Sequence, residues 1–279
     1  MNSQAESVPP WPTASVQGDP GGPVLVYLPG VHGDDTLLGS FRAQVGDDVR
    51  LVAFTYPVST DVTLPELAAG VWTQLRSLTD QPVWLLAESF GSQVAWAMLA
   101  QAKTTPETTL PVQGMILAGG FVRHPWPWAV AAVRWLLGNL SPSVIRGFFR
   151  IYPWWARFAY RNAPEILAAL PEFVARRRDP ADQAAMLHRL LLIQLADLRG
   201  IARETGLPVY QLTGLWDPVV PWPWVRNWLR NDCPGWQEAV VVGGADHVVL
   251  GTGTAPAVAA VRRWLGLTPR STDRQTQLG

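Results

Sequence analysis

Cysteine is almost absent from this chain, which contains a single thiol, Cys233. One thiol cannot form an intramolecular disulfide, and it offers no cluster of sulfur ligands for a metal. The sequence therefore favours a reducing compartment over a secreted location. We interpret Cys233 as an ordinary free thiol and expect neither a metal nor another cofactor.

Long apolar runs are also missing, since no stretch reaches the ~18 residues that a membrane-spanning helix requires. The first segment, residues 1–22, is polar and rich in proline and glycine, and it has no basic start followed by an apolar run. This pattern predicts neither a signal peptide nor a membrane span, so we expect a cytoplasmic protein. We predict that residues 1–22 and the polar tail, residues 269–279, are flexible.

There is no excess of charge of either sign, because 22 Lys and Arg residues balance 22 Asp and Glu residues. A basic footprint of the kind that binds nucleic acid is therefore missing, and no nucleic-acid partner is expected. Apolar residues make up 48% of the 279 residues and charged residues only 16%, with 15 tryptophans. That composition predicts one large folded domain, or one core with an inserted subdomain.

Short apolar runs recur along the chain and alternate with helical patterns. The runs predict buried strands at residues 23–28, 49–54, 83–87, 115–118, 209–212 and 239–242. Helix-spaced apolar positions fall between them, at residues 64–78 and 91–102. Strands that alternate with helices predict an α/β fold with a mostly parallel central sheet and helices on both faces. Residues 23–120 and 204–268 would form this core.

The segment 121–203 breaks the alternation, because it has helical patterns and no clear strand. We predict that it is an inserted helical cap, and we expect its prolines to mark helix starts or turns: Pro125, Pro127, Pro142, Pro153, Pro164, Pro171 and Pro180. Between residues 121 and 200 there are 11 arginines and 5 acidic residues, a surplus of six positive charges.

A serine follows one of the predicted strands directly, in the sequence Ala87-Glu88-Ser89-Phe90-Gly91, and a predicted helix begins at once after it. A serine on such a sharp turn has its hydroxyl lifted above the sheet, and the turn needs small residues two positions before and after it. The sequence here resembles the nucleophile elbow of the α/β-hydrolase family, Gly-x-Ser-x-Gly, with alanine in place of the first glycine.

The loop after the first predicted strand, Pro29-Gly30-Val31-His32-Gly33, resembles the loop that supplies a backbone donor in this family. By that resemblance, the N–H groups of Val31, with His32 as the alternative, and of Phe90 would form an oxyanion hole for the charge on an attacked carbonyl oxygen. The side chain of His32 is a candidate substrate contact.

Two loops after later strands supply the partners that a serine nucleophile needs. Asp217 lies in Gly214-Leu215-Trp216-Asp217-Pro218, and His247 ends Gly243-Gly244-Ala245-Asp246-His247, positions where α/β-hydrolases carry their acid and their histidine. The histidine would remove the serine proton, and the aspartate would orient the histidine. We interpret Asp246, the nearest competitor to Asp217, as a residue that shapes the loop.

The resemblance implies a serine hydrolase that cleaves a carboxylic ester or thioester through an acyl-Ser89 intermediate. Acyltransferases, peptidases and cofactor-free peroxidases share this triad, so another bond or acceptor stays an alternative, as does a catalytically silent binding protein. A dehalogenase is disfavoured, because that branch has aspartate at the position of Ser89.

The composition of the predicted cap bears on the substrate. Its aromatic residues fit an apolar acyl or aromatic ester, or alternatively the cap's own core: Trp126, Trp128, Trp135, Phe148, Phe149, Trp154, Trp155 and Phe158. Its arginines, among them Arg146, Arg150, Arg157, Arg161 and Arg176-Arg177-Arg178, could attract an anionic substrate or a phospholipid surface. A solvated arginine face is the more common explanation, so we predict a small-molecule substrate, and contact with a membrane surface stays possible but is not predicted.

Overall fold

A seven-stranded sheet forms the centre of the computed structural model, which describes residues 12–140, 147, 164–177 and 179–268. The strands are β1 (Thr13–Gln17), β2 (Val24–Leu28), β3 (Arg50–Thr55), β4 (Val83–Glu88), β5 (Val112–Ala118), β6 (Val209–Gly214) and β7 (Trp236–Val242). Their order across the sheet is β1-β3-β2-β4-β5-β6-β7. The strands β2 to β7 are parallel to their neighbours, and only β1 is antiparallel.

The central strands are apolar at every position because both of their faces are covered. In β2 all five residues are buried, and they alternate between the two sides of the sheet. Val24, Val26 and Leu28 belong to one hydrophobic cluster, whereas Leu25 and Tyr27 belong to the other. A two-residue period within a continuous apolar run is what a doubly covered parallel sheet requires.

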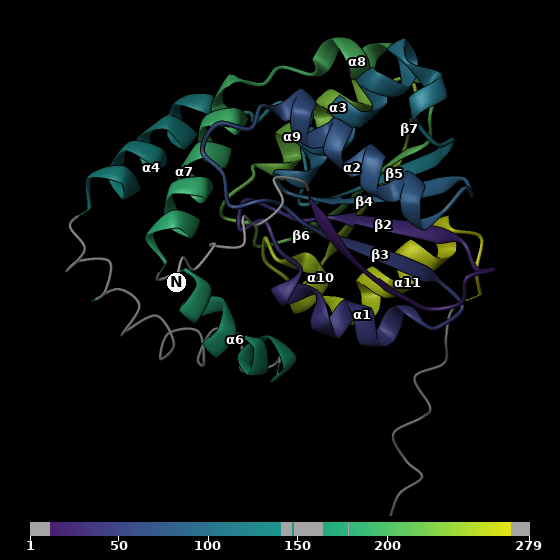
Figure 1. Cartoon of the computed structure of the whole chain (residues 1–279), viewed down its shortest axis with the longest axis horizontal. Helices are drawn as coiled ribbons and strands as arrows, with labels where there is room; N and C mark the ends of the chain where they lie inside the picture. Colours follow the sequence, from purple (N-terminus) through teal and green to yellow (C-terminus); the bar gives the residue numbers. More distant parts are fainter. Residues whose placement is uncertain (1–11, 141–146, 148–163, 178, 269–279) are drawn as a thin grey trace, which may run out of the picture.

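Helices cover both faces of this sheet (Figure 1). One face packs against α2 (Leu64–Leu78), α3 (Gly91–Thr104), α8 (Arg199–Glu204) and α9 (Trp222–Asp232). The other packs against α1 (Gly39–Val45), α10 (Val249–Thr252) and α11 (Thr254–Trp264). Two short 3₁₀ helices, η1 (Thr36–Leu38) and η2 (Pro106–Thr108), lie in the connections. The predicted α/β fold class is thus confirmed.

The segment between β5 and β6 is helical, and the described part of residues 121–203 contains no strand. It forms α4 (Pro127–Asn139), α6 (Pro164–Arg176), α7 (Pro180–Leu195) and most of α8, with α4, α6 and α7 together on one side of the molecule in Figure 1. Three of these helices begin at a proline. In the part of the chain that the structure describes, no helix is long and apolar enough to cross a bilayer.

One proline of the predicted cap departs from expectation. Pro171 lies inside α6, so the prediction of a helix start or a turn is wrong there. Proline within a helix removes one backbone hydrogen bond. Pro142 and Pro153 lie outside the described residues.

The edge strand β1 lies within the segment 1–22, which the sequence predicted to be flexible. Its residues pair with β3 from Thr13 opposite Thr55 to Gln17 opposite Leu51. The strand is polar and largely exposed, and Gly18 ends it at a φ of 89°. An edge strand needs no continuous apolar run, so the hydrophobic pattern that revealed the other strands did not reveal this one.

Candidate active site

Ser89 occupies the sharp turn between β4 and α3. Its φ is 49°, and it is the one non-glycine residue with a positive φ in the described part of the chain. This region of backbone space is costly for a residue with a Cβ, and such residues gather at functional sites. The turn is fixed by hydrogen bonds from Ser89 N–H to the carbonyl of Ala118, 3.0 Å, and from Ser92 N–H to the carbonyl of Ser89, 3.0 Å.

The turn requires a small residue after the serine because the chain passes close to β2. A Cβ at Gly91 would lie 2.1 Å from the carbonyl oxygen of Leu28, which is backbone and cannot move aside cheaply. Ala87 is fully buried in β4, where it pairs with Leu28 on one side and Leu117 on the other. The methyl group of alanine fits at this position, so the departure from the usual motif is accommodated.

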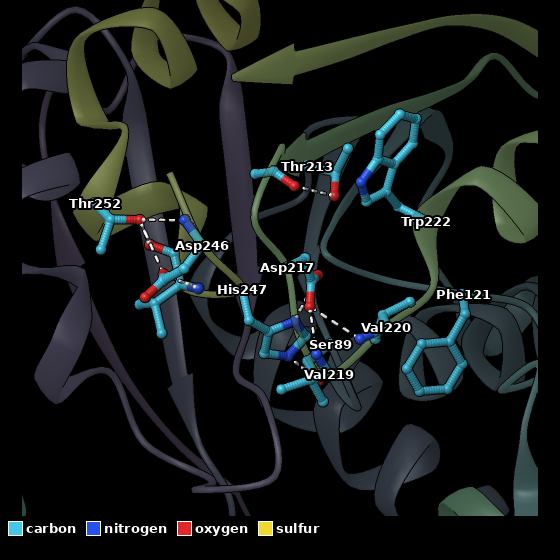
Figure 2. Close-up of polar contacts among 12 residues, drawn as sticks. Ser89, Phe121, Thr213, Asp217, Val219, Val220, Trp222, Asp246, His247 and Thr252 are labelled. Carbon is cyan, nitrogen blue, oxygen red and sulfur yellow. Dashed lines mark hydrogen bonds and ion pairs between the residues drawn. The ribbon is translucent and has the colours of Figure 1, made fainter. Parts of the chain in front are cut away.

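His247 links Ser89 and Asp217 in one hydrogen-bonded chain (Figure 2). Its Nε2 lies 2.9 Å from Ser89 Oγ, and its Nδ1 lies 2.8 Å from Asp217 Oδ2. A carboxylate accepts only, so Nδ1 carries the proton and Nε2 is free to accept the proton of the serine hydroxyl. The structure thus brings the three predicted side chains together in the arrangement that general base catalysis needs.

Asp217 is held by the backbone that follows it. Its Oδ1 accepts hydrogen bonds from the N–H groups of Val219, 2.8 Å, and Val220, 2.9 Å, which leaves Oδ2 for His247. The carboxylate is fully buried, whereas the His247 side chain is 17% exposed. Burial alone would lower the pKa of His247, but the hydrogen bond and negative charge of Asp217 outweigh burial and raise that pKa above its ordinary value.

Asp246 faces its own loop, away from the imidazole (Figure 2). Its Oδ1 accepts from Val248 N–H, 2.9 Å, and from Thr252 Oγ1, 3.0 Å. These bonds hold the turn that carries His247, as expected for a loop-shaping residue.

The loop with the first predicted oxyanion donor lies directly against Ser89. A Cβ at Gly30 would lie 3.4 Å from Ser89 Cβ, so the backbone passes the nucleophile at contact distance. Gly33 N–H donates to the Gly30 carbonyl, 2.9 Å, which closes a tight turn with Val31 and His32 at its centre. The N–H groups of Val31 and Phe90 have no acceptor in the described part of the chain.

His32 is half-buried and lines a cavity of about 440 Å³. Burial lowers the pKa of His32, so its imidazole is neutral near pH 7. Its Nε2 is buried and has no hydrogen-bond partner among the described residues, and its ring lies 6.3 Å from that of Phe173 in α6, edge to face. The cavity is also lined by charged side chains from the core and the inserted helices: Asp34, Arg176, Asp179, Asp182 and Arg189.

Two features of the site were not found from the sequence. Glu88, next to the nucleophile, is buried and accepts a hydrogen bond from the hydroxyl of Tyr27 on the neighbouring strand. Burial and the Glu88 charge raise the pKa of Tyr27 well above its usual value, so the phenol stays a donor. Gly119, at a φ of 59°, lets the chain pass His247, because a Cβ there would lie 3.2 Å from the imidazole. A glycine directly after a predicted strand was the sequence feature that could have identified this close approach.

The cap residues singled out from the sequence divide into three groups. Trp126, Trp128 and Trp135 are exposed on or beside α4, and they form neither a core nor part of the cavity lining. Arg177 is buried in ion pairs with Asp34 and Asp182, so a solvated face is the wrong explanation for it, whereas its neighbour Arg176 is 45% exposed and pairs with Glu172 and Asp34. The others lie outside the described residues: Arg146, Phe148, Phe149, Arg150, Trp154, Trp155, Arg157, Phe158, Arg161 and Arg178. Among the residues that are described, no His, Cys, Asp and Glu side chains gather in a group able to hold a metal ion.

Comparison with known proteins identifies similar chains among hydrolases. The chain is 27% identical over 209 residues to a pimeloyl-[acyl-carrier protein] methyl ester esterase of Methylococcus capsulatus, covering 71% of this chain and 77% of that protein. No family model matches the chain.

Solved structures share the whole architecture. An α/β hydrolase, MGS-M2, from a Medee basin deep-sea metagenome library superposes with a TM-score of 0.71 at 14% identity, covering 94% of this chain and 96% of that one. An esterase from Thermogutta terrifontis has a TM-score of 0.66 at 20% identity, with 91% and 93% covered. An esterase from Exiguobacterium antarcticum has a TM-score of 0.71 at 15% identity, with 91% and 95% covered.

Proposed function

Because the chain has the α/β-hydrolase fold, we propose that it hydrolyses a carboxylic ester through an acyl-serine intermediate on Ser89. The observation that carries the proposal is the hydrogen-bonded chain from Ser89 through His247 to Asp217. The similarity to a methyl ester esterase supports an ester as the substrate. An apolar acyl group is proposed from the composition of the inserted segment alone, since the described tryptophans of that segment do not line the cavity.

In the first half of the reaction, Ser89 Oγ attacks the ester carbonyl while His247 Nε2 removes the hydroxyl proton. The charge that develops on the carbonyl oxygen would be stabilised by the N–H groups of Val31 and Phe90. Asp217 stabilises the imidazolium and holds Nδ1–H in place. The bond to the alkoxy oxygen then breaks, and the leaving alcohol takes the proton from His247.

In the second half, water replaces the alcohol. His247 Nε2 removes a proton from the water, whose oxygen attacks the acyl carbon and re-forms the tetrahedral intermediate. The bond to Ser89 Oγ breaks, and the imidazolium returns a proton to the serine. One water is consumed for each ester cleaved, and no cofactor takes part in this scheme.

Hydrolysis of p-nitrophenyl esters of increasing acyl length tests the proposal. We expect the wild type to release nitrophenol and Ser89→Ala to lose about 10⁴-fold or more in kcat. Ser77→Ala is the matched control, because Ser77 is exposed on α2 and its hydroxyl bonds only the carbonyl of Gln74 in its own helix. Equal activity of Ser89→Ala and the wild type would remove Ser89 as the nucleophile. The acyl length with the highest kcat/KM would define the acyl specificity.

A further inference from the structure

Arg189 of the inserted helix α7 reaches into the core and binds the turn beside the nucleophile. Its Nη1 donates to the carbonyls of Val31, 3.1 Å, and His32, 3.3 Å. Its Nη2 donates to the carbonyl of Pro57 in the loop after β3, 3.0 Å. Arg189 is 4% exposed, so three neutral backbone acceptors hold a buried guanidinium between two core loops. A planar fork of five N–H donors suits such a set of carbonyls, and an ammonium group does not.

Gly33 leaves space in the turn for the Arg189 guanidinium. Gly33 has a φ of 82°, and a Cβ there would lie 2.5 Å from Arg189 Cζ, so only glycine lets the side chain approach. The ring of Tyr56 lies 5.9 Å from Cζ on another side. The cavity of about 440 Å³ adjoins His32, Gly33 and Arg189, so the turn is not held in place by close packing on that side.

Hydrogen bonds therefore determine the conformation of the turn. Gly33 N–H holds the Gly30 carbonyl, and no donor other than Arg189 reaches the Val31 and His32 carbonyls within the described part of the chain. A peptide N–H points opposite to its carbonyl. A flip of the peptide between Val31 and His32 would replace the His32 N–H, the alternative oxyanion donor, by a carbonyl oxygen. It would also drive His32 toward a positive φ and disturb the turn that carries the Val31 N–H. The bond from Arg189 to the Val31 carbonyl opposes that flip.

We propose that Arg189 is a positioning residue of the reaction, which fixes the oxyanion turn through the carbonyls of Val31 and His32. This inference rests on the proposed function, in which that turn supplies an N–H donor to the developing oxyanion. Arg189 touches no reacting atom and acts only through the backbone. Because it comes from α7, the inserted helices set the geometry of a donor that belongs to the core.

Arg262 provides a matched control. It is likewise buried, at 3% exposed, and donates to the carbonyls of Val45 and Thr268 and to the carboxylate of Asp48. It lies on α11, and its partners belong to neither the oxyanion turn nor the triad. Its loss removes the hydrogen bonds of another buried guanidinium without touching the turn.

The experiment compares steady-state kinetics of the wild type, Arg189→Ala and Arg262→Ala on the best p-nitrophenyl ester, alongside their melting temperatures. We expect both variants to melt at lower temperature. Arg189→Ala should lose about 10- to 100-fold in kcat with KM within about threefold of wild type, because a displaced donor weakens transition-state binding selectively. Arg262→Ala should keep kcat within about twofold. Guanidinium chloride at about 20 mM, far below denaturing concentrations, should restore part of the kcat of Arg189→Ala and not change that of Arg262→Ala.

A folded Arg189→Ala with wild-type kcat, or one whose kcat falls no further than that of Arg262→Ala, would overturn the inference. If Arg189→Ala does not fold, Arg189→Lys decides: a kcat at least about fivefold below wild type is expected, and wild-type kcat would overturn the inference. A different result would contradict the proposed function itself: a wild-type protein that neither hydrolyses esters nor reacts with a fluorophosphonate at Ser89. Failure of the proposed function can therefore be distinguished from failure of the proposed role of Arg189.

Discussion

Among single residues, Asp217 determines both the orientation and the charge of the imidazole that faces Ser89. Its two oxygens have separate partners, the Val219 and Val220 N–H groups on Oδ1 and His247 Nδ1 on Oδ2. An asparagine would retain the oxygen that binds the backbone. Its amide nitrogen would face Nδ1–H with a donor, so the imidazole would have to adopt the other tautomer.

Asp217→Asn should therefore lower kcat by about 10³- to 10⁴-fold while the protein stays folded. Ester hydrolysis and a thermal melt measure the two properties. Asp246→Asn is the comparison. Among the described residues the Asp246 carboxylate binds Val248 and Thr252 and not the imidazole, so the kcat of this variant should stay within about threefold of wild type. Similar losses in both variants would contradict the assignment of Asp217 as the orienting acid.

The pH dependence of kcat follows from the same contact. A general base works in its neutral form, so activity falls as the pH drops through the pKa of His247. Asp217 raises that pKa above its ordinary value, 6.5, against the effect of burial. The acid limb of the wild-type profile should lie above pH 6.5. In Asp217→Asn it should move to lower pH, because the strongest contacts that oppose burial are lost and only the weaker effects of the Glu88 and Asp246 charges remain. A limb that does not move, or moves upward, would contradict this account.

The sequence located Ser89, Asp217 and His247 because each follows a predicted strand and lies in a recognisable short motif. It could not locate Arg189, since that residue contacts Val31 across 158 positions of the chain and belongs to no motif. The hydrogen bond from Tyr27 to Glu88 was missed for the same reason, because two adjacent parallel strands bring together residues that are 61 positions apart in the chain. Short sequence motifs therefore reveal site residues whose position is set by their own loop. They do not reveal residues that reach the site from a distant part of the chain through tertiary packing.

At the scale of elements, the close approach of the β4–α3 turn to β2 makes the elbow sensitive to a single methyl group. Gly91→Ala would place Cβ 2.1 Å from a backbone oxygen of Leu28. We expect a loss of about 2–4 kcal/mol in the free energy of unfolding, together with loss of Ser89 reactivity, because the turn must open to relieve the contact.

Gly39→Ala is the matched substitution for urea denaturation. Gly39 begins α1 with a φ of −51°, and nothing lies within 4 Å of the position its Cβ would take. The free energy of unfolding of the Gly39→Ala variant should rise by about 0.5–1 kcal/mol, because alanine is the better helix former. Equal effects of the two substitutions would show that the elbow tolerates a Cβ.

Most elements could be predicted because their apolar residues repeat with the period of a strand or a helix. β2 and α2 were found in this way, with α2 at the predicted residues 64–78. β1 was missed because an exposed edge strand carries little of that signal. The proline in α6 was misread because a helix packed on its neighbours can accept the loss of one backbone bond.

At the scale of the whole molecule, buried ion pairs join the inserted helices to the core. Arg177, which follows α6, pairs with Asp34 after β2 and with Asp182 in α7. Burial would raise the pKa of Asp34, but the neighbouring His32, the hydrogen bond with Thr36 and the positive charge of Arg177 together outweigh burial and lower it. Asp34 thus serves as a charged anchor for the helical segment.

Asp34→Asn should weaken this attachment and cost about 1–3 kcal/mol in the free energy of unfolding, measured by urea denaturation at pH 7. Glu204→Gln is the control, since its ion pair with Lys103 is exposed at both ends and should contribute about 0–1 kcal/mol. A smaller effect for Asp34→Asn than for Glu204→Gln would contradict the anchoring role.

Labelling with a fluorophosphonate, followed by mass spectrometry of the digested protein, shows whether Ser89 is an activated nucleophile. We expect one adduct, on the peptide that contains Ser89, which is absent from Ser89→Ala and much slower to form in His247→Ala. An unlabelled wild-type protein, or an adduct that persists in Ser89→Ala, would contradict this expectation.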